Sequence, residues 1–568
     1  MAYDLVIKNG TVIDGSGMPR YHADVGIREG RIENIGRINE KSTETIDAEG
    51  HIVSPGFVDG HTHMDAQVAW DPLGTCSCWH GVTSVVMGNC GFTLAPCRES
   101  EKDMVMRNLE RAEDISPAAM DAGIEWSWET FPQYLDAVDK LPKGINYAGY
   151  IGHSALRTYV MGERAFEAPA TEDDLRLMGH ELTNAIKAGA IGFSTSRTPN
   201  HQTPDDRPVA SRIAEWSEVE YLVNKMGVLN AGIFEIAHEQ PGRNPERVRE
   251  YFDRMKKLAI DSGRPMTWGM FSTRVAPELW RPFFDLLDEV ANEGGRMFAQ
   301  THSRALNVLL SFKSNLPFDN WDHWKEIRNL PIDQQINALR DPAIKARLIE
   351  AANKRYEGPR KIGTEARPPK WEWIFPLFDM KGPYQSIAEI AKSRGKDNVE
   401  TMIDLALERD LDLFFMQPIA NEDQDHVIEM MKHPRSVVTF SDSGAHVSQI
   451  MDSSLQTHVF SHWVREKQAL TLEEAVRMVT FEPATLWGLN NRGLIRQGFA
   501  ADITILDPET ICPRLPEVVY DLPAGARRLK QKADGILATV VNGKILMKDC
   551  EHTGELPGQL IRGPLAAG

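Results

Sequence analysis

The segment GFVDGHTH, residues 56–63, decides the fold class of this chain and points to its chemistry. A short apolar strand ends here in two histidines, and side chains alternate across a strand, so His61 and His63 point the same way. Neutral imidazoles at this spacing can share one divalent cation. A bare His-x-His pair more often marks two surface histidines, but the apolar strand before this one favours a metal site.

Short apolar strands alternate with helical segments for most of the chain beyond this point. Eight segments have this character: residues 56–59, 83–87, 145–151, 190–193, 232–235, 265–268, 297–299 and 437–440. Such alternation predicts an α/β fold, a (β/α)8 TIM-type barrel that keeps its chemistry at the carboxyl ends of the strands. A ninth candidate strand at 412–415 leaves the strand count open.

The two ends of the chain have a different texture. Residues 1–54 contain short strands with Asn-Gly and Asp-Gly steps at Asn9 and Asp14, which are hairpin signals. Residues 501–507 and 538–545 predict further strands near the other end. We expect residues 1–54 and 481–568 to form one small β-sandwich around a barrel domain of residues 55–480.

Residues 305–400 fit the barrel pattern poorly because they are rich in tryptophan, proline and charge. We predict a helical insertion over the barrel mouth. Two interpretations remain open at this stage: a lid that shapes the substrate pocket, and a packing or oligomerisation element.

Composition excludes some classes of function. The chain has 568 residues and a formal net charge of −18, which disfavours binding to nucleic acid or to anionic membranes. It offers neither a signal-peptide pattern nor an apolar run of about 18 residues, so we expect no membrane span. Six cysteines in so long a chain predict a reducing, cytoplasmic location rather than a disulfide scaffold. The oligomeric state is open, a homo-oligomer included.

Two further motifs follow predicted barrel strands. In VVTFSDSGAH, residues 437–446, Asp442 could bind the metal and hold a proton, the alternative being a helix cap. His446 is either a pocket residue or a hydrogen bonder that fixes the turn. In GNCG, residues 88–91, a Cys90 thiolate could bridge two zinc ions, although a lone buried cysteine is usually inert. The Cys76-Ser77-Cys78 stretch precedes its strand, so we interpret it as packing.

Together these motifs resemble the N-acyl-D-amino-acid deacylase (D-aminoacylase) branch of the amidohydrolase superfamily. The resemblance runs nearly end to end and includes DLVIKNG (4–10), PGFVD (55–59), GNCGF (88–92), GHSALR (152–157), GFSTSR (192–197), Ser441-Asp442 and GFAAD (498–502). It implies a barrel with a flanking β-sandwich and one or two Zn²⁺ ions. It also implies that Cys90 replaces the carboxylated lysine of other amidohydrolases as a metal ligand, and that Asp442 is the catalytic base.

The chain departs from this family where the second metal subsite should be. Well-known members take two more histidines from the fifth and sixth strands. Here the fifth strand reads FEIAHE, residues 234–239, and the sixth has no histidine. His238 is displaced by about one residue, which reverses the face of a strand, and Glu235 and Glu239 are rival ligands.

Other polar residues after barrel strands are candidate substrate contacts. His153 could bind substrate or stabilise an oxyanion. Arg197 and Arg304 could pair with a substrate carboxylate, and each is equally plausible in a structural ion pair. His302 and His446 complete this group, with a hydrogen-bonded histidine at the barrel rim as the alternative.

The sequence therefore predicts a zinc-dependent amidohydrolase that cleaves a linear amide bond. The expected reaction is N-acyl-D-amino acid deacylation of a small, carboxylate-bearing amide, with His61, His63, Cys90 and Asp442 holding the metal and Asp442 moving the proton. Hydrolysis of another amide, a cyclic amide, a carbamoyl group or a lactone is the alternative. A barrel scaffold without catalysis is disfavoured because all four of these residues are present.

Overall fold

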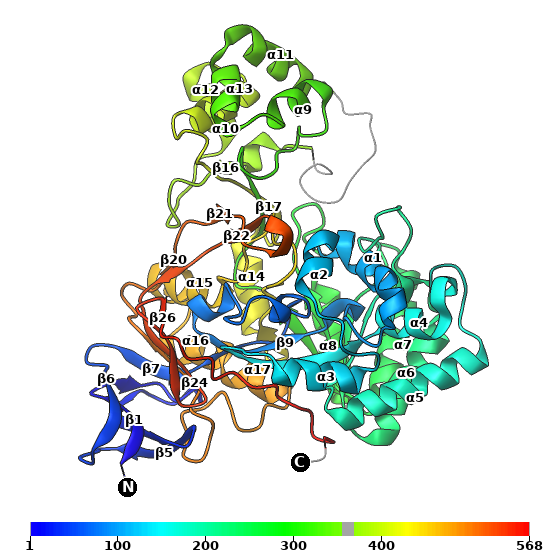
Figure 1. The fold of residues 1–568 in the computed structure, drawn as a ribbon, viewed down its shortest axis with the longest axis vertical. Coiled ribbons are helices and arrows are strands. Elements are labelled where there is room, and N and C mark those ends of the chain that lie inside the picture. Colours follow the sequence, from blue (N-terminus) through cyan, green and yellow to red (C-terminus); the bar gives the residue numbers. More distant parts are fainter. Residues whose placement is uncertain (1, 355–367, 567–568) are drawn as a thin grey trace.

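Eight parallel strands form one curved sheet at the centre of the computed structural model, which describes residues 2–354 and 368–566 (Figure 1). In order, neighbour beside neighbour, they are β8 (Phe57–Asp59), β9 (Val82–Met87), β10 (Asn146–Gly152), β11 (Gly192–Ser196), β12 (Ile233–Ala237), β13 (Met266–Met270), β14 (Met297–Thr301) and β18 (Ser436–Val438). All eight predicted strands are confirmed as members of this sheet.

The first and last strands meet just beyond their carboxyl ends. Thr62 and Ser443 form a parallel bridge, and the His63 amide donates to the Ser443 carbonyl at 2.8 Å. The Thr439 hydroxyl also donates to the Asp59 carboxylate at 2.8 Å. These contacts close the barrel and bring the histidine motif beside the loop that carries Asp442.

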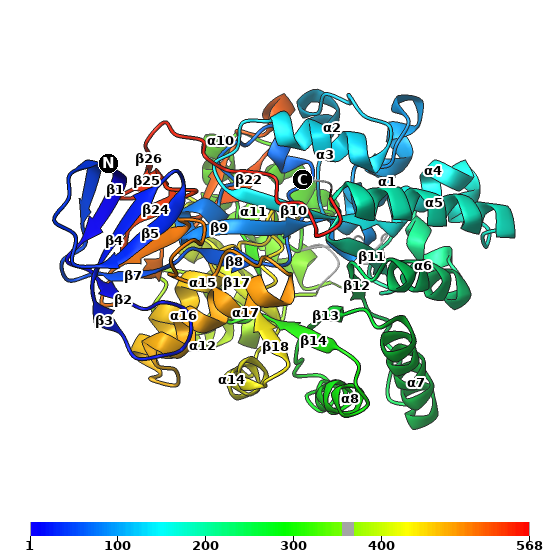
Figure 2. The same cartoon turned by 90° about the horizontal axis from the view of Figure 1, so that it is seen from below.

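Helices cover the outside of the barrel (Figure 2). They are α3 (Phe131–Lys140), α5 (Glu172–Ala188), α6 (Trp216–Leu229), α7 (Pro245–Ser262), α8 (Arg281–Asn292), α14 (Gln424–Lys432), α16 (Leu472–Val479) and α17 (Phe481–Leu486). Helix α5 shows why they form: Thr171 and Asp174 make a capping box at its start, and Gly189 ends it in the left-handed region. Within the described residues, no helix combines the length and the apolar character that a bilayer span requires.

Further helices follow the second and third strands: α1 (Lys102–Ala112) and α2 (Pro117–Gly123) after β9, and α4 (His153–Met161) after β10. Helices α1 and α2 precede α3 in the chain, so this crossover from β9 to β10 is longer than a simple barrel unit requires. The extra segment supplies part of the wall around the barrel mouth.

The two chain ends pair into a β-sandwich. One sheet holds β5 (Arg31–Gly36), β4 (Asp24–Arg28), β1 (Tyr3–Lys8) and β6 (Ser42–Asp47). The other holds β26 (Glu551–His552), β25 (Lys544–Lys548), β24 (Ile536–Val541), β19 (Ile503–Leu506), β7 (Ile52–Pro55), β2 (Thr11–Val12) and β3 (Tyr21–His22). Side chains from both ends, such as Leu5, Ile7, Ile503 and Val540, share one core.

The Asn9-Gly10 step is not a hairpin turn, so this prediction is wrong. Strand β1 pairs with β4 and β6, whereas β2 pairs with β3 and β7 in the other sheet. Asn9 adopts φ +60°, and its Nδ2 donates to Asp47 Oδ1 at 2.9 Å, which holds the chain as it crosses between sheets. The Asn542-Gly543 step does form a hairpin, between β24 and β25.

The C-terminal segment does not enter the sandwich in full. Helix α17 packs with β8 and β18 of the barrel, and Tyr147 of β10 forms a bridge with Leu560. Two short ribbons, β20 (Cys512–Pro513) with β23 (Ala533–Asp534) and β21 (Glu517–Val519) with β22 (Arg528–Lys530), also lie outside its two sheets. Part of the stretch 481–568 therefore supports the barrel instead.

A separate lobe interrupts the barrel between β14 and α14 (Figure 1). It contains β15 (Leu306–Leu310), α9 (Asp322–Arg328), α10 (Ile332–Arg340), α11 (Pro342–Ala352), β16 (Phe375–Pro376), α12 (Ile387–Arg394), α13 (Asn398–Leu407) and β17 (Phe415–Ala420). Its own apolar core includes Leu310, Phe318 and Trp324. The ninth candidate of the sequence, residues 412–415, overlaps β17 only at Phe415, and β17 pairs with β15 rather than with the barrel.

The lobe is attached at the barrel mouth. The Leu309 amide donates to the Gln449 carbonyl at 2.8 Å, and Val308 forms a bridge with Ile450, in the loop that follows β18. Because β17 returns to β15, the insertion continues past residue 400 and includes a three-stranded sheet. It is therefore longer and less purely helical than the sequence predicts.

Candidate metal centre

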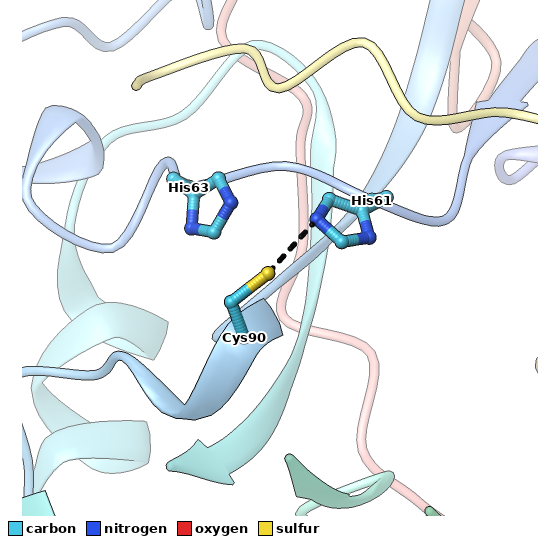
Figure 3. Close-up of side chains that lie close together, drawn as sticks. All are labelled: His61, His63 and Cys90. Carbon is cyan, nitrogen blue, oxygen red and sulfur yellow. Dashed lines mark hydrogen bonds between the residues drawn. The ribbon is translucent and has the colours of Figure 1, made fainter. Parts of the chain in front are cut away.

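Three buried side chains converge at the carboxyl ends of β8 and β9 (Figure 3). The donor atoms of His61, His63 and Cys90 all lie within 4.8 Å of one another. His61 Nε2 is 3.5 Å from Cys90 Sγ. His61 is fully buried and Cys90 is 6% exposed, so the group faces the inside of the barrel, as the alternation along β8 predicts.

Cys90 is brought into this group by a sharply turned backbone. Gly88 has φ +81°, and a Cβ there would lie 2.6 Å from the Tyr150 carbonyl oxygen, so only glycine fits. Cys90 itself has φ +56°. Its amide donates to Glu235 Oε2 at 2.7 Å, which fixes the turn against β12. Gly88 thus lets the chain turn close to β10 and bring Cys90 to the histidines.

Asp442 faces both histidines. Its Oδ1 lies 3.4 Å from His61 Nε2 and 3.4 Å from His63 Nε2. The loop that presents it is strained, since Phe440, Asp442 and His446 all have positive φ. Gly444 has φ +97° and packs so closely on His63 that a Cβ would lie 2.4 Å from its carbonyl oxygen. No helix begins at Asp442 in the described chain, so the alternative of a helix cap is wrong.

These separations fit a tetrahedral zinc ion. With Zn–N and Zn–O bonds of about 2.0–2.2 Å and Zn–S bonds of about 2.3 Å, two N or O ligands lie roughly 3.4 Å apart, and S and N ligands roughly 3.6 Å apart. The observed distances are 3.4 Å for Asp442 to each imidazole and 3.5 Å for Cys90 to His61. His61, His63 and Cys90 are therefore the candidate ligands that lie closest together among the described residues, and Asp442 faces the two imidazoles from outside this group.

The electrostatics of the group also favour a cation. Burial lowers the pKa of His61 to about 3, which keeps this imidazole neutral and able to donate a lone pair. Burial raises the pKa of the Cys90 thiol well above its ordinary value, and the charges of Glu235, Glu113 and Asp442 raise it further. Cys90 therefore needs a bound cation to become a thiolate.

His61 is oriented by a residue that the sequence analysis missed. Gln300 Oε1 on β14 lies 2.6 Å from His61 Nδ1 and accepts a hydrogen bond from it, which directs the Nε2 lone pair toward Cys90 and Asp442. The Phe440 ring stacks on the imidazole at 3.8 Å between centroids. A polar residue inside an otherwise apolar strand, MFAQT, was the available signal for Gln300.

A second missed residue is Glu113, between α1 and α2. It is 1% exposed, and its Oε2 lies 3.6 Å from His63 Nε2 and 3.8 Å from His446 Nε2. His446 is thus at the rim of the centre and not merely a turn residue. No sequence signal could have found Glu113, because it lies far from any strand and inside an ordinary charged helix end.

Comparison with known proteins agrees with this geometry. The model of the amidohydrolase family matches residues 44–547, and a model of the urease alpha-subunit N-terminal domain matches residues 1–56. The chain belongs to the amidohydrolase family.

Relatives of this amidohydrolase include two enzymes of Alcaligenes xylosoxydans xylosoxydans. D-aminoacylase is 26% identical and N-acyl-D-glutamate deacylase is 28% identical, each over 98% of this chain and over 97% and 96% of its own length. The structure of N-acyl-D-glutamate deacylase from Bordetella bronchiseptica, complexed with zinc and a phosphonate inhibitor, covers 99% of this chain and 100% of its own, with a TM-score of 0.64 and 23% identity. The predicted resemblance to the deacylase branch is confirmed, and so is the fold.

On the fifth strand of this amidohydrolase, Glu235 faces the centre and His238 does not. Glu235 is fully buried, and burial raises its pKa to about 8. His238 instead packs its ring on Phe283 at 4.8 Å between centroids, and its Nδ1 lies 2.6 Å from the Glu239 carbonyl oxygen. The displacement along FEIAHE therefore turns His238 away, and the prediction of His238 as a ligand is not supported.

His302 and Arg304 follow β14 and lie beside the centre. The Arg304 amide donates to His302 Nδ1 at 3.1 Å, and His302 Nε2 is buried without a hydrogen-bond partner in the part of the chain that is described. Arg304 donates to Ser454 Oγ at 2.7 Å and lies 3.5 Å from Asp452 Oδ1. Arg304 is thus held by the loop that follows β18.

His153 and Arg197 are committed to other partners. His153 Nδ1 lies 2.8 Å from Thr195 Oγ1, and its Nε2 lies 2.8 Å from Glu218 Oε1, so both nitrogens are used inside the fold. Arg197 Nε donates to Glu239 Oε1 at 3.0 Å. The structure gives both residues structural contacts, which corrects their prediction as substrate ligands. Cys76 and Cys78 lie in the main apolar core, in agreement with a packing role.

Proposed function

We propose that this amidohydrolase is a zinc-dependent enzyme that hydrolyses the linear amide bond of N-acyl-D-amino acids. The observation that carries the proposal is the buried cluster of His61, His63 and Cys90 donor atoms, with Asp442 Oδ1 3.4 Å from both imidazoles. The choice of substrate is supported by relatives that are named as deacylases and match the chain over nearly its whole length.

The geometry suggests which atom of each residue would bind the metal ion. A zinc ion bound here would polarise the scissile carbonyl and lower the pKa of a nearby water. His61 and His63 hold it through Nε2, Cys90 through its thiolate and Asp442 through Oδ1. If a second ion binds, its candidate ligand on β12 is Glu235 and not His238, because the Glu235 carboxylate lies beside Cys90. Quantification of zinc in the purified protein would decide between one ion and two.

Asp442 is the proposed general base and acid. Burial opposes its ionisation, but the hydrogen bond and charge of His63 outweigh burial and lower its pKa to about 2, so Asp442 is ionised. The carboxylate can therefore accept a proton from the attacking water. It returns this proton to the amine nitrogen as the C–N bond breaks, so the proton count balances without a covalent enzyme intermediate.

The substrate contacts are proposed around the mouth. Of the two arginines predicted to bind a substrate carboxylate, Arg304 is the remaining candidate. A substrate carboxylate would share its guanidinium with Asp452. His302 and His446 complete the candidate contacts. The described cysteines, which all carry free thiols, support the proposed cytoplasmic location.

A substrate panel tests the proposal. Purified protein is assayed with N-acyl-D-amino acids, their L-enantiomers, cyclic amides, carbamoyl compounds and lactones, and zinc is quantified on the same sample. We expect preferential release of free D-amino acid and at least one zinc ion for each chain. Turnover only of a cyclic amide, a carbamoyl compound or a lactone would transfer the function to the alternative, and full activity in metal-free protein would refute the mechanism.

A further inference from the structure

Glu113 reaches the metal centre from outside the barrel strands. It ends α1, and its amide donates to the Leu109 carbonyl at 2.9 Å as the last bond of that helix. Its own carbonyl accepts from the His446 amide at 2.6 Å, which ties the loop between α1 and α2 to the loop after β18. The next residue, Asp114, accepts from Ser448 Oγ at 2.6 Å. The backbone of Glu113 is therefore fixed beside Asp442 on two sides.

In the described part of the chain, the carboxylate of Glu113 is held only by long contacts to two imidazoles. Its Oε1 is buried and has no hydrogen-bond partner among the residues that the structure describes. Its Oε2 faces His63 Nε2 at 3.6 Å and His446 Nε2 at 3.8 Å, both too long for hydrogen bonds. A buried, ionised carboxylate without hydrogen bonds is unfavourable unless a cation compensates its charge.

The distance between Glu113 Oε2 and His63 Nε2 is close to the distance between two ligands of one metal ion. His63 Nε2 is also the nitrogen that faces Asp442 Oδ1 at 3.4 Å, so both carboxylates approach the same donor atom. Two oxygen or nitrogen ligands of one ion lie roughly 3.4 Å apart. The 3.6 Å between Glu113 and His63 is therefore close to the edge of a coordination shell, as is the distance from Asp442.

We infer that Glu113 is a metal ligand of this centre, supplied by the loop between α1 and α2 rather than by a barrel strand. The inference rests on the proposed function because it requires a bound divalent ion. It assigns Oε2 as a fifth ligand beside His63, which expands the tetrahedral shell to a five-coordinate one that zinc also adopts. His446, at the outer side of the same carboxylate, then positions Glu113 instead of binding the ion itself.

Metal binding by the full-length chain tests this inference. The wild type, Glu113→Gln and Glu113→Asp are stripped of metal and titrated with Zn²⁺ against a chromophoric chelator, and the visible absorption of the Co²⁺-loaded forms is recorded. We expect Glu113→Gln to bind Zn²⁺ at least about 10-fold more weakly and to change the intensity of the Co²⁺ bands. Glu113→Asp keeps the charge but retracts the carboxylate by one methylene, so its affinity should fall as well.

The matched control is Asp114→Asn. It removes a carboxylate from the same loop and a contact to Ser448, but Asp114 does not face the histidines. We expect wild-type affinity and a wild-type Co²⁺ spectrum from it, and circular dichroism verifies that every variant is folded. A similar loss of affinity in Asp114→Asn would reduce the effect to loop anchoring and overturn the inference.

The remaining outcomes separate the inference from the proposed function. Wild-type protein that binds no metal contradicts the proposed function itself. Wild-type protein that binds zinc, together with a Glu113→Gln variant of equal affinity and spectrum, contradicts only the ligand role of Glu113. Equal affinity in Glu113→Asp and the wild type would show that charge alone matters, which also overturns direct ligation.

Discussion

Strands β8 and β12 both lead into a histidine, but only the histidines after β8 reach the metal centre. His61 and His63 continue the inward face of β8 and meet Cys90 and Asp442. His238 lies three residues after the inward Glu235, so it turns outward onto Phe283. The difference teaches that a ligand is decided by the face of the strand that it occupies and not by its residue type within a motif.

The largest loss of zinc affinity is expected from a substitution in the histidine pair that follows β8. His61→Ala removes a neutral, fully buried nitrogen donor from the centre, so we expect zinc affinity to fall by more than about 100-fold and activity with it. Metal content after dialysis and turnover are measured on the same preparation. Full zinc occupancy in this variant would contradict the assignment of β8 as the strand that anchors the metal.

Asp442→Asn should be nearly as severe for turnover but not for metal binding. An amide keeps the shape of the side chain but cannot accept the proton, so kcat should fall about 10²–10⁴-fold. Zinc affinity should fall because Asp442 is one of the proposed ligands, but the two histidines and Cys90 should still hold the ion when Zn²⁺ is supplied in excess. Retained activity would exclude Asp442 as the general base.

Gln300→Leu tests how much the hydrogen bond between His61 and Gln300 contributes to metal binding. The substitution removes the acceptor of the 2.6 Å contact to His61 Nδ1 while filling a similar volume. Loss of such an outer contact typically costs about 10–100-fold in metal affinity, so we expect an effect of about that size. The companion substitution Gln300→Glu keeps an acceptor at this position and should retain most of the affinity. An equal loss in both variants would mean that Gln300 acts only through packing.

The smallest changes in metal affinity are expected from substitutions on β12, and they should differ between Glu235 and His238. Glu235→Ala removes the acceptor of the Cys90 amide, a contact worth about 1–3 kcal/mol, and should lower metal affinity modestly. His238→Ala loses only packing on Phe283 and should leave metal affinity unchanged. A weaker metal site in His238→Ala than in Glu235→Ala would reverse the comparison between the two residues.

Local signals in the sequence were sufficient where one element acts alone. The eight barrel strands are short apolar runs bounded by turn residues, and each retains its identity because burial on both faces demands apolar residues. GFVDGHTH predicts that His61 and His63 point the same way, because alternation along one strand is independent of the rest of the fold, and the structure places both side chains together. Asn542-Gly543 similarly makes its hairpin from the adjacent strands alone.

Local sequence signals gave wrong predictions where the pairing strand or the partner side chain lies far away in the sequence. Asn9-Gly10 has the composition of a hairpin, yet β6 and β7 compete for the strands on either side of it. The lobe was recognised as an interruption, but the return of β17 to β15 could not be predicted since it depends on pairing across about a hundred residues. His153 and Arg197 matched family motifs, while their partners Glu218 and Glu239 lie on other segments.

The sequence by itself determined the barrel, the β8 histidine pair, Cys90 and Asp442, because each depends on a periodicity or a motif within a few residues. Only the tertiary structure decided which distant side chains complete the centre: Gln300 behind His61, Glu235 beside Cys90 and Glu113 in front of His63. The physical reason is that a coordination site is defined by distances of about 3–4 Å between side chains. Those distances are set by barrel closure and by loop packing, which no local pattern encodes.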